Sequence, residues 1–324
     1  MTPRKTPLLF TLLSIPLSTL IVSPASADQS STDETASALL IAGEIVTQEN
    51  VTPTPNTSGY SSTTANSTIT IPHQTSGNVI IDDQKSDASD IAISIPGDST
   101  ETATPLAAGG IAYENQDYST TVLPKSDGSV QLVTTAKSAT SPQDYTYTFA
   151  INDGSHFRTE EDGGVSLIGA NGKWEGGLAA PWAKDANGNS LPTFYRVDGN
   201  KITQHISFNN NTAFPVVADP WWAGNLIDHT EWANDLWEWS PTLKVYPTLW
   251  GRIAHPIYGD PAWWETLEET ERDGHPNPDT GTMYNQFLCH WDFVRLRSPR
   301  KESWNLDTKL PDKGYLGFLW SGCN

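Results

Sequence analysis

Apolar and polar residues alternate in short runs through the middle of the chain, and Asp-Gly or Asn-Gly pairs separate these runs. In one run, Tyr145, Tyr147 and Phe149 fall on the same side. Alternation with a period of two is typical of β-strands, and these dipeptides favour the tight turns of β-hairpins. The pattern predicts an antiparallel β-sandwich-like domain over residues 109–220.

The last hundred residues have a different apolar pattern, because they contain eleven of the thirteen tryptophans. A hairpin is predicted over residues 229–249, where the β-rich stretch LKVYPTLW ends the segment. A helix is predicted from Asp260 and Pro261, since aspartate caps free N–H groups and proline suits the first helical position. The inward stripe of this helix would consist of Trp263, Trp264 and Leu267.

A further strand is predicted around Cys289. Phe287, Cys289, Trp291 and Phe293 alternate there with Leu288, His290 and Asp292. This period of two indicates a strand with one strongly apolar face. With the hairpin and the helix, it predicts a small α+β domain over residues 221–324.

Apolar residues are sparse in residues 28–108, which are rich in Ser, Thr, Pro, Asn and Asp. This stretch has eleven acidic residues and one basic residue, Lys85. Such a composition buries little apolar surface to offset the entropy of ordering. We therefore expect residues 28–108 to form a disordered, acidic, Ser/Thr/Pro-rich spacer.

The N-terminus has the organisation of a secretory signal peptide. Arg4 and Lys5 precede an apolar run over residues 8–22, and an Ala-x-Ala site ends at Ala27. We predict cleavage after Ala27 and a secreted protein, extracellular or associated with the cell envelope. No later run approaches the 18 apolar residues of a membrane helix, so no membrane span is expected.

The chain has two cysteines, Cys289 and Cys323. In an exported protein a disulfide between them is the favoured interpretation. The alternatives are a zinc ligand and a nucleophile, but two cysteines without C-x-x-C spacing make a weak metal site. We predict a Cys289–Cys323 disulfide, with no metal and no cofactor.

Candidate site residues lie near these cysteines. On a strand, His290 and Asp292 would share a face, and a carboxylate beside an imidazole suits general-base chemistry. The sequence marks no nucleophile for them, so an ordinary His–Asp hydrogen bond is the competing interpretation. A second candidate is a basic run that could bind a phosphate or carboxylate polymer. The competing interpretation is that these basic side chains form ion pairs with acidic residues of the same chain. This run comprises Arg295, Arg297, Arg300 and Lys301.

Charge and exposed aromatic residues narrow the classes of partner. The formal net charge of −19 argues against general binding of nucleic acid, which requires a basic surface. Exposed tryptophans could stack on sugar rings, although most are expected in the core. The tryptophans considered for this role are Trp221, Trp222, Trp263 and Trp264.

Four short segments carry a resemblance to a known family. QFLCH, KESWNL, LPDKGY and the closing CN resemble the actinobacterial secreted "domain of unknown function 2599" family, and Leu310 replaces the arginine of its usual RP pair. The resemblance implies export and a compact domain but no activity. PWAKDANGN and FPVVADPWW also resemble a β-domain that precedes varied C-terminal domains in actinobacterial secreted proteins, which implies a carrier role.

Taken together, these patterns favour a secreted, non-enzymatic binding or interaction module of otherwise unknown function. Its partner would be an anionic envelope polymer or a carbohydrate. The alternative is a small secreted hydrolase or antibacterial effector that uses His290 and Asp292.

Overall fold

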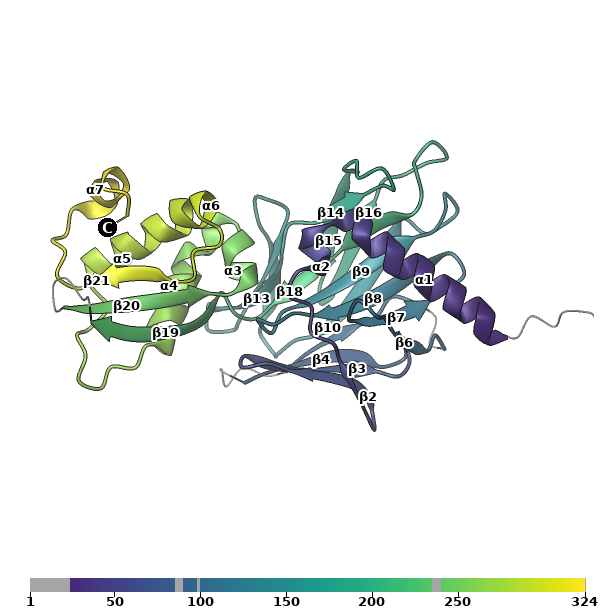
Figure 1. Cartoon of the computed structure of the whole chain (residues 1–324), viewed down its shortest axis with the longest axis horizontal. Coiled ribbons are helices and arrows are strands. Elements are labelled where there is room, and N and C mark those ends of the chain that lie inside the picture. Colours follow the sequence, from purple (N-terminus) through teal and green to yellow (C-terminus); the bar gives the residue numbers. More distant parts are fainter. Residues whose placement is uncertain (1–23, 85–89, 98–99, 235–239, 324) are drawn as a thin grey trace, which may run out of the picture.

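The computed structural model describes residues 24–84, 90–97, 100–234 and 240–323. Two large antiparallel sheets form a β-sandwich, and a smaller α+β domain follows it along the long axis of the molecule (Figure 1). The predicted antiparallel sandwich and α+β domain are both confirmed. The sandwich, however, begins much earlier in the chain than residue 109.

The first sheet contains eight strands over the described residues, and five of them come from the stretch expected to be a spacer. In spatial order they are β1 (Thr54–Asn56), β2 (Gly59–Thr63), β3 (Ser67–Pro72), β4 (Asn78–Asp83), β5 (Ile91–Ser94), β10 (Asp144–Ala150), β16 (Lys201–Ile206) and β15 (Thr193–Asp198).

The second sheet contains ten strands over the described residues. Its main path is β11 (His156–Thr159), β12 (Val165–Ile168), β13 (Trp174–Leu178), β18 (Trp221–Ala223), β9 (Val130–Ala136), β8 (Tyr118–Pro124), β7 (Ile111–Glu114) and β6 (Ala103–Pro105). Off this path, β14 (Trp182–Lys184) pairs with β17 (Val216–Asp219), which pairs with β9.

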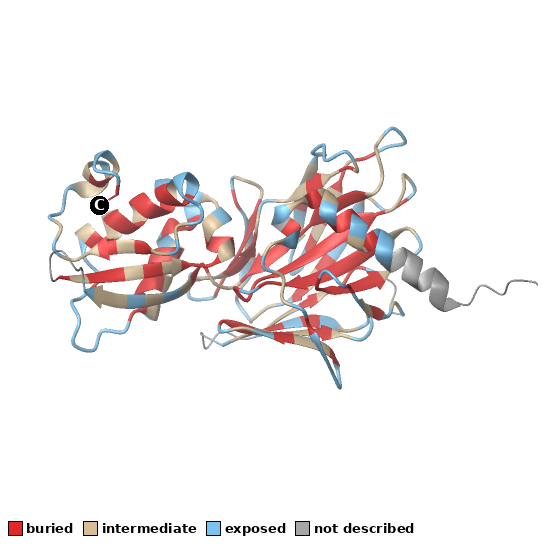
Figure 2. Cartoon of the chain, viewed as in Figure 1, coloured by how far each residue is buried: buried red, intermediate tan, exposed pale blue. Residues whose placement is uncertain are grey.

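The expectation of a disordered spacer is corrected by the described part of residues 28–108. Strand β5 pairs with β10, and Ile93 lies opposite Phe149 in the register. The few apolar residues of this stretch alternate along its strands and are buried between the sheets (Figure 2). Low apolar content did not prevent folding because the opposite wall of the core comes from later strands. The buried residues concerned are Ile69, Ile71, Val79, Ile81, Ile93 and Ile95.

Helices α1 (Pro24–Ala42) and α2 (Glu44–Thr47) also fall partly within that stretch. They pack on the outer side of the ten-stranded sheet, where α1 runs across β7, β9 and β17 (Figure 1). A small third core lies beneath them. Its members from these helices are Ala38, Leu39, Ala42 and Val46.

The C-terminal domain has a three-stranded sheet in the described chain, with helices packed on it. The predicted hairpin is confirmed as β19 (Ile227–Asn234) and β20 (Pro241–Pro247), and β21 (Trp304–Asp307) completes the sheet. The tip of the hairpin, residues 235–239, lies outside the described residues. The helices are α3 (Leu249–Ile253), η1 (Pro256–Tyr258), α4 (Gly259–Glu269), α5 (Gly281–Cys289), η2 (His290–Val294), α6 (Arg295–Arg297) and α7 (Gly314–Trp320).

The predicted helix is confirmed as α4, but Asp260 does not cap it: the helix begins at Gly259, and its N-cap residue, Tyr258, makes no side-chain capping hydrogen bond. The predicted inward stripe is also only partly correct. Trp263 and Leu267 are buried, whereas 58% of Trp264 is exposed. Trp264 directly follows Trp263 and is therefore turned by about a quarter of a helical turn from it. This rotation carries the second indole out to the surface.

The predicted strand around Cys289 is wrong, because this segment is helical from α5 through η2. Its buried residues recur at helical spacing, from Met283 through Phe287 to Trp291. The hydroxyl of Thr280 accepts a hydrogen bond from the Met283 backbone N–H at 3.3 Å and caps the helix. A seven-residue alternation is too short to outweigh a capped helix whose apolar face meets a core.

The sandwich and the C-terminal domain share side chains where they meet. Trp221 belongs to β18 of the sandwich sheet, but its indole packs in the core of the C-terminal domain. The Asp127 carboxylate, in the turn between β8 and β9, accepts a hydrogen bond at 3.0 Å from the backbone N–H of Trp250, in the first turn of α3. Trp250 in turn donates its indole N–H to the carbonyl of Trp221 at 3.2 Å. The two domains are therefore joined by a buried hydrogen-bond network.

Candidate functional site

The predicted disulfide is confirmed: Cys289 and Cys323 are bonded, with their Cα atoms 5.4 Å apart. Both are buried in the core of the C-terminal domain. The bond ties the segment after α7 to the end of α5, directly before the candidate residues His290 and Asp292.

His290 is almost completely buried, with 1% of its surface exposed. Its Nδ1–H donates to the carbonyl of Gln286 at 2.9 Å, which leaves Nε2 to accept from the Lys301 ammonium at 3.4 Å. Burial, and then the charge of Lys301, lowers the pKa of His290 to about 4. The imidazole is therefore neutral at physiological pH and fully engaged with protein groups.

Asp292 does not interact with His290 in the way the sequence suggested. Side chains two residues apart on a helix point in different directions. The prediction that His290 and Asp292 share a strand face is therefore wrong. The Asp292 carboxylate instead accepts a hydrogen bond from the Tyr315 hydroxyl at 2.6 Å. Burial and this bond raise the pKa of Tyr315. A catalytic role for His290 and Asp292 stays a prediction.

The basic run does not form one surface. Arg295 is buried and donates to the backbone carbonyls of α3 and η2, while its guanidinium lies 4.5 Å from the centre of the Trp291 ring. Lys301 is half-buried against His290. Arg297 and Arg300 are exposed. Only these two residues of the four are fully available to a partner.

The buried His290 predicts a pH-dependent stability. Between about pH 4 and 6.5 the unfolded chain binds a proton here that the folded chain does not, so stability rises with pH across this window. The full effect is about 3 kcal/mol. Urea unfolding at pH 4.5 and 7 should show a larger pH difference for the wild type than for His290→Gln.

The wild type has to be compared with His290→Gln because the titration of Asp219 changes stability with pH in the opposite direction. Burial raises its pKa to about 7, so its contribution to stability falls as pH rises between about 4 and 7. Subtracting the His290→Gln profile from that of the wild type removes this contribution. Parallel profiles for the two proteins would contradict the proposed burial of a neutral histidine.

An open groove of about 300 Å³ lies between the N-terminal parts of α4 and α5. Its wall includes the exposed Trp264, and the buried Trp263 lies behind Tyr284, with ring centres 5.7 Å apart. Among the candidate tryptophans of the sequence, Trp221, Trp222 and Trp263 are buried, and Trp264 alone is exposed. The residues lining the groove are Asp260, Trp263, Trp264, Asp279, Thr280, Gly281 and Tyr284.

Polar groups converge on this groove from two helix starts. Asp260 lies in the first turn of α4, and Thr280 caps α5. The Tyr284 hydroxyl donates to the Asp260 carboxylate at 2.6 Å, and burial together with this bond raises the pKa of Tyr284 to about 12. The phenol therefore stays protonated. Sequence reasoning used Asp260 only as a cap and passed over Thr280 and Tyr284, which meet only because α4 and α5 pack together.

Two further features bear on the kind of site. Within the described ranges, no cluster of three or more His, Cys, Asp or Glu side chains is arranged to hold a metal ion. None of the helices in the described residues is both long and apolar enough to cross a bilayer.

The fold and the site define a class: a β-sandwich protein with a disulfide-closed, tryptophan-rich α+β domain that has an aromatic groove. The chain belongs to the family described as protein of unknown function (DUF2599), whose sequence model matches residues 227–324. This confirms the resemblance carried by the QFLCH, KESWNL and LPDKGY segments.

The matched relatives are uncharacterised proteins of mycobacteria. One from Mycobacterium tuberculosis (strain H37Rv) is 43% identical over 103 residues, which is 31% of this chain and 65% of the relative. One from Mycobacterium leprae is 30% identical over 102 residues, covering 30% of this chain and 77% of the relative. The chain thus spans about two thirds of the length of the M. tuberculosis relative. No solved structure matches the chain significantly.

Proposed function

We propose that the protein is an extracellular or envelope-associated binding protein whose C-terminal domain recognises carbohydrate through the groove at Trp264. The observation that carries this proposal is the solvent-exposed indole of Trp264 in a groove that also contains carboxylates and a hydroxyl. A large aromatic side chain left in water beside a concave polar surface is typical of a binding site.

The chemistry of the groove suits a sugar ring. The apolar face of an indole packs against the C–H groups of a ring, and the hydroxyls of the ring require hydrogen-bond acceptors. Asp260 and Asp279 supply carboxylate oxygens, and Thr280 has a hydroxyl that both donates and accepts. The bond from Tyr284 fixes the Asp260 side chain in position. One surface thus combines stacking with directional polar contacts.

The charge of the groove favours a neutral or amino sugar. Asp260 and Asp279 make this surface negative, which disfavours a phosphate or carboxylate polymer here. An anionic polymer would have to use the exposed Arg297 and Arg300, without help from the buried Arg295. The enzymatic alternative gains no support from the geometry either, because His290 is inaccessible to a substrate.

The extracellular location rests on two features of the chain. The N-terminal 27 residues have the organisation of a signal peptide, and the only two cysteines form a disulfide. Disulfides persist in oxidising compartments and are rare in the cytosol. In this setting the sandwich would act as the carrier that presents the groove.

We expect Trp264→Ala to weaken carbohydrate binding about thirtyfold, since a central tryptophan contributes about 2 kcal/mol to an interface. The measurement is the binding of the purified exported chain to an array of neutral and amino-sugar oligosaccharides, followed by titration of the best ligand. Trp320→Ala is the matched control, because Trp320 is 88% exposed and is not part of the groove.

Near-ultraviolet circular dichroism checks that both variants are folded. The proposal fails if the wild type binds none of the sugars. It fails equally if a folded Trp264→Ala protein retains wild-type affinity, or if Trp320→Ala removes the binding instead.

A further inference from the structure

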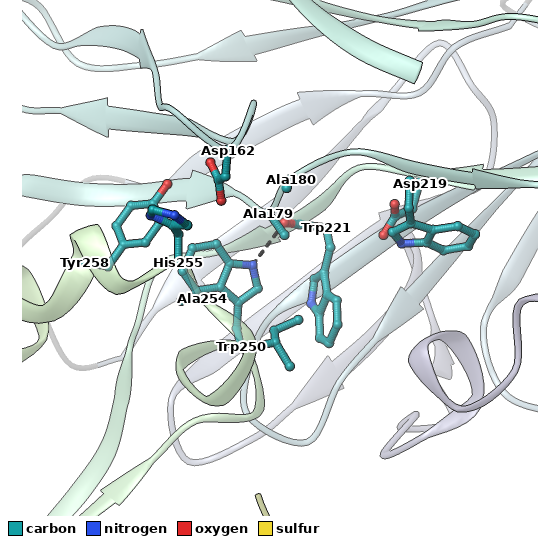
Figure 3. A pocket seen from close by; sticks show the side chains of 11 residues that line it. Asp162, Ala179, Ala180, Asp219, Trp221, Trp250, Ala254, His255 and Tyr258 are labelled. Atoms are coloured by element: carbon teal, nitrogen blue, oxygen red, sulfur yellow. Dashed lines mark hydrogen bonds between the residues drawn. The ribbon is translucent and has the colours of Figure 1, made fainter. Parts of the chain in front are cut away.

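A second pocket, of about 230 Å³, lies between the sandwich and the C-terminal domain. Figure 3 shows Asp162, His255 and Tyr258 towards one end and Asp219 towards the other, with Trp250 and Trp221 between them. Neither domain alone could form it, because its walls come from β17 and β18 on one side and from α3 and η1 on the other.

Four aromatic side chains line this pocket. They are Trp182, Trp221, Trp250 and Tyr258, and the ring centres of Trp250 and Tyr258 are 5.4 Å apart. The indole N–H groups of two of them are already used within the protein. Trp221 donates to the Ser129 hydroxyl at 2.9 Å, and Trp250 donates to the Trp221 carbonyl at 3.2 Å. These bonds fix the orientation of the two indoles, whose edges form the wall of the pocket.

Two carboxylates complete the lining. Asp219 is 2% exposed, and one of its oxygens accepts from the Gln131 amide at 2.7 Å. Asp162 lies at the rim, in the turn between β11 and β12, where one oxygen accepts from the backbone N–H of Gly164 at 2.9 Å. Both side chains are thus held in place by neutral donors. Burial raises the pKa of Asp219 to about 7, and a cation beside it would favour the ionised form.

The charged side chains around the pocket indicate the sign of a ligand. The charge of the buried Lys125 acts on Asp219 and lowers its pKa, but the Lys125 ammonium donates its hydrogen bonds elsewhere, to the carbonyl of Val46 at 2.8 Å and to the side chain of Asn50 at 2.7 Å. At the other end, Arg158 is paired with Glu160 at 2.8 Å. No lysine or arginine lines the pocket, and its ionisable side chains besides Asp162 and Asp219 are His255 and Tyr258.

We propose that this interdomain pocket binds a small organic ammonium ion. Aromatic faces attract such cations through their quadrupoles, and walls of several rings are the usual way in which proteins recognise quaternary ammonium groups. The chain already contains one contact of this type, since the Lys125 ammonium lies 5.4 Å from the centre of the Trp221 ring. The carboxylates at the two ends add the charge complementarity that the rings lack.

Other ligand classes fit this lining less well. A divalent metal requires several oxygen or nitrogen ligands converging on one point, and the described residues contain no such cluster. An anion would meet two carboxylates in an apolar surrounding. A neutral apolar molecule would make no electrostatic contact with Asp162 or Asp219. An organic cation interacts favourably both with the aromatic rings and with the carboxylates of Asp162 and Asp219.

The test is isothermal titration of the full exported chain with choline and with its neutral carbon isostere, 3,3-dimethylbutan-1-ol. We expect choline to bind at least tenfold more tightly, because only the charged molecule interacts with the carboxylates and the ring quadrupoles. Asp219→Asn should weaken choline binding at least tenfold, and Asp162→Asn should weaken it less. Asp198→Asn removes an exposed carboxylate from the β15–β16 turn and is the charge-matched control.

Absence of choline binding, or equal affinity for the neutral isostere, would overturn the proposal. So would unchanged binding in a folded Asp219→Asn protein. If Asp219→Asn does not fold, the comparison of choline with its isostere on the wild type and on Asp162→Asn decides instead. Trp264→Ala should bind choline normally, so this result is separate from that of the carbohydrate proposal.

Discussion

Replacing Cys323 with serine should lower the free energy of unfolding by about 2–5 kcal/mol, the usual loss when a native disulfide is removed. Cys289 and Cys323 are 34 residues apart in the sequence, and the chain-entropy treatment gives about 3.8 kcal/mol for a loop of that length. Both cysteines are buried in the core, so the serine hydroxyl would be removed from water without a hydrogen-bond partner, which adds to the loss of stability. Guanidinium unfolding under oxidising conditions measures the difference.

The same measurement after reduction provides the control for Cys323→Ser. Reduced wild type should approach the stability of the variant, because both then lack the cross-link. Equal stability of the oxidised wild type and Cys323→Ser would show that the bond does not constrain the fold.

Replacing Arg295 with alanine should destabilise the protein by at least about 3 kcal/mol. Its guanidinium donates to the carbonyls of Trp291, Gly251 and Ala254, all of which would lose a buried donor. The aliphatic part of the side chain would also leave a cavity. Burial lowers the pKa of Arg295 to about 10, so the group is still charged at neutral pH. Urea unfolding at pH 7 gives the loss directly.

Arg297→Ala is the matched control, because it removes the same type of side chain from an exposed position two residues away. Its effect should stay within about 0.5 kcal/mol. Similar losses for the two variants would contradict the structural role of Arg295. A large loss for Arg295→Ala alone would also explain why a basic run in the sequence need not be a basic surface.

Features whose signal lies within a short stretch of chain were predictable. The β19–β20 hairpin and the residues of β10 alternate with a period of two, and the buried residues of α4 recur at helical spacing. The disulfide was predictable because the chain has only two cysteines. In these cases the local preference and the tertiary contacts agree, as minimally frustrated sequences require.

Features that depend on distant partners were missed. The isoleucines of β3 to β5 appeared too few to fold, since their core is completed by Tyr147 and Phe149 more than fifty residues later. Seven alternating residues around Cys289 are compatible with a strand or a helix, and the signal that decides is the Thr280 cap.

The same reasoning applies to the candidate sites. Tyr284 meets Asp260 across 24 positions of sequence, and Asp162 reaches the pocket of Trp250 from another domain. No spacing rule connects such pairs. Which of the adjacent residues Trp263 and Trp264 is exposed depends on how α4 is rotated about its axis, and the sequence of the two residues does not reveal this rotation.

The turn between β8 and β9 limits how freely the family domain could be recombined with other carriers. Lys125 in this turn donates to the carbonyl of Val46 in α2 and to Asn50 just beyond that helix. Asp127, two residues later, accepts the Trp250 N–H at the start of α3, 123 positions away. That helix start therefore depends on an acceptor encoded outside residues 227–324. A gene fusion that joined this domain to a different carrier would have to provide a new acceptor for Trp250, or leave this backbone N–H without its partner at the junction.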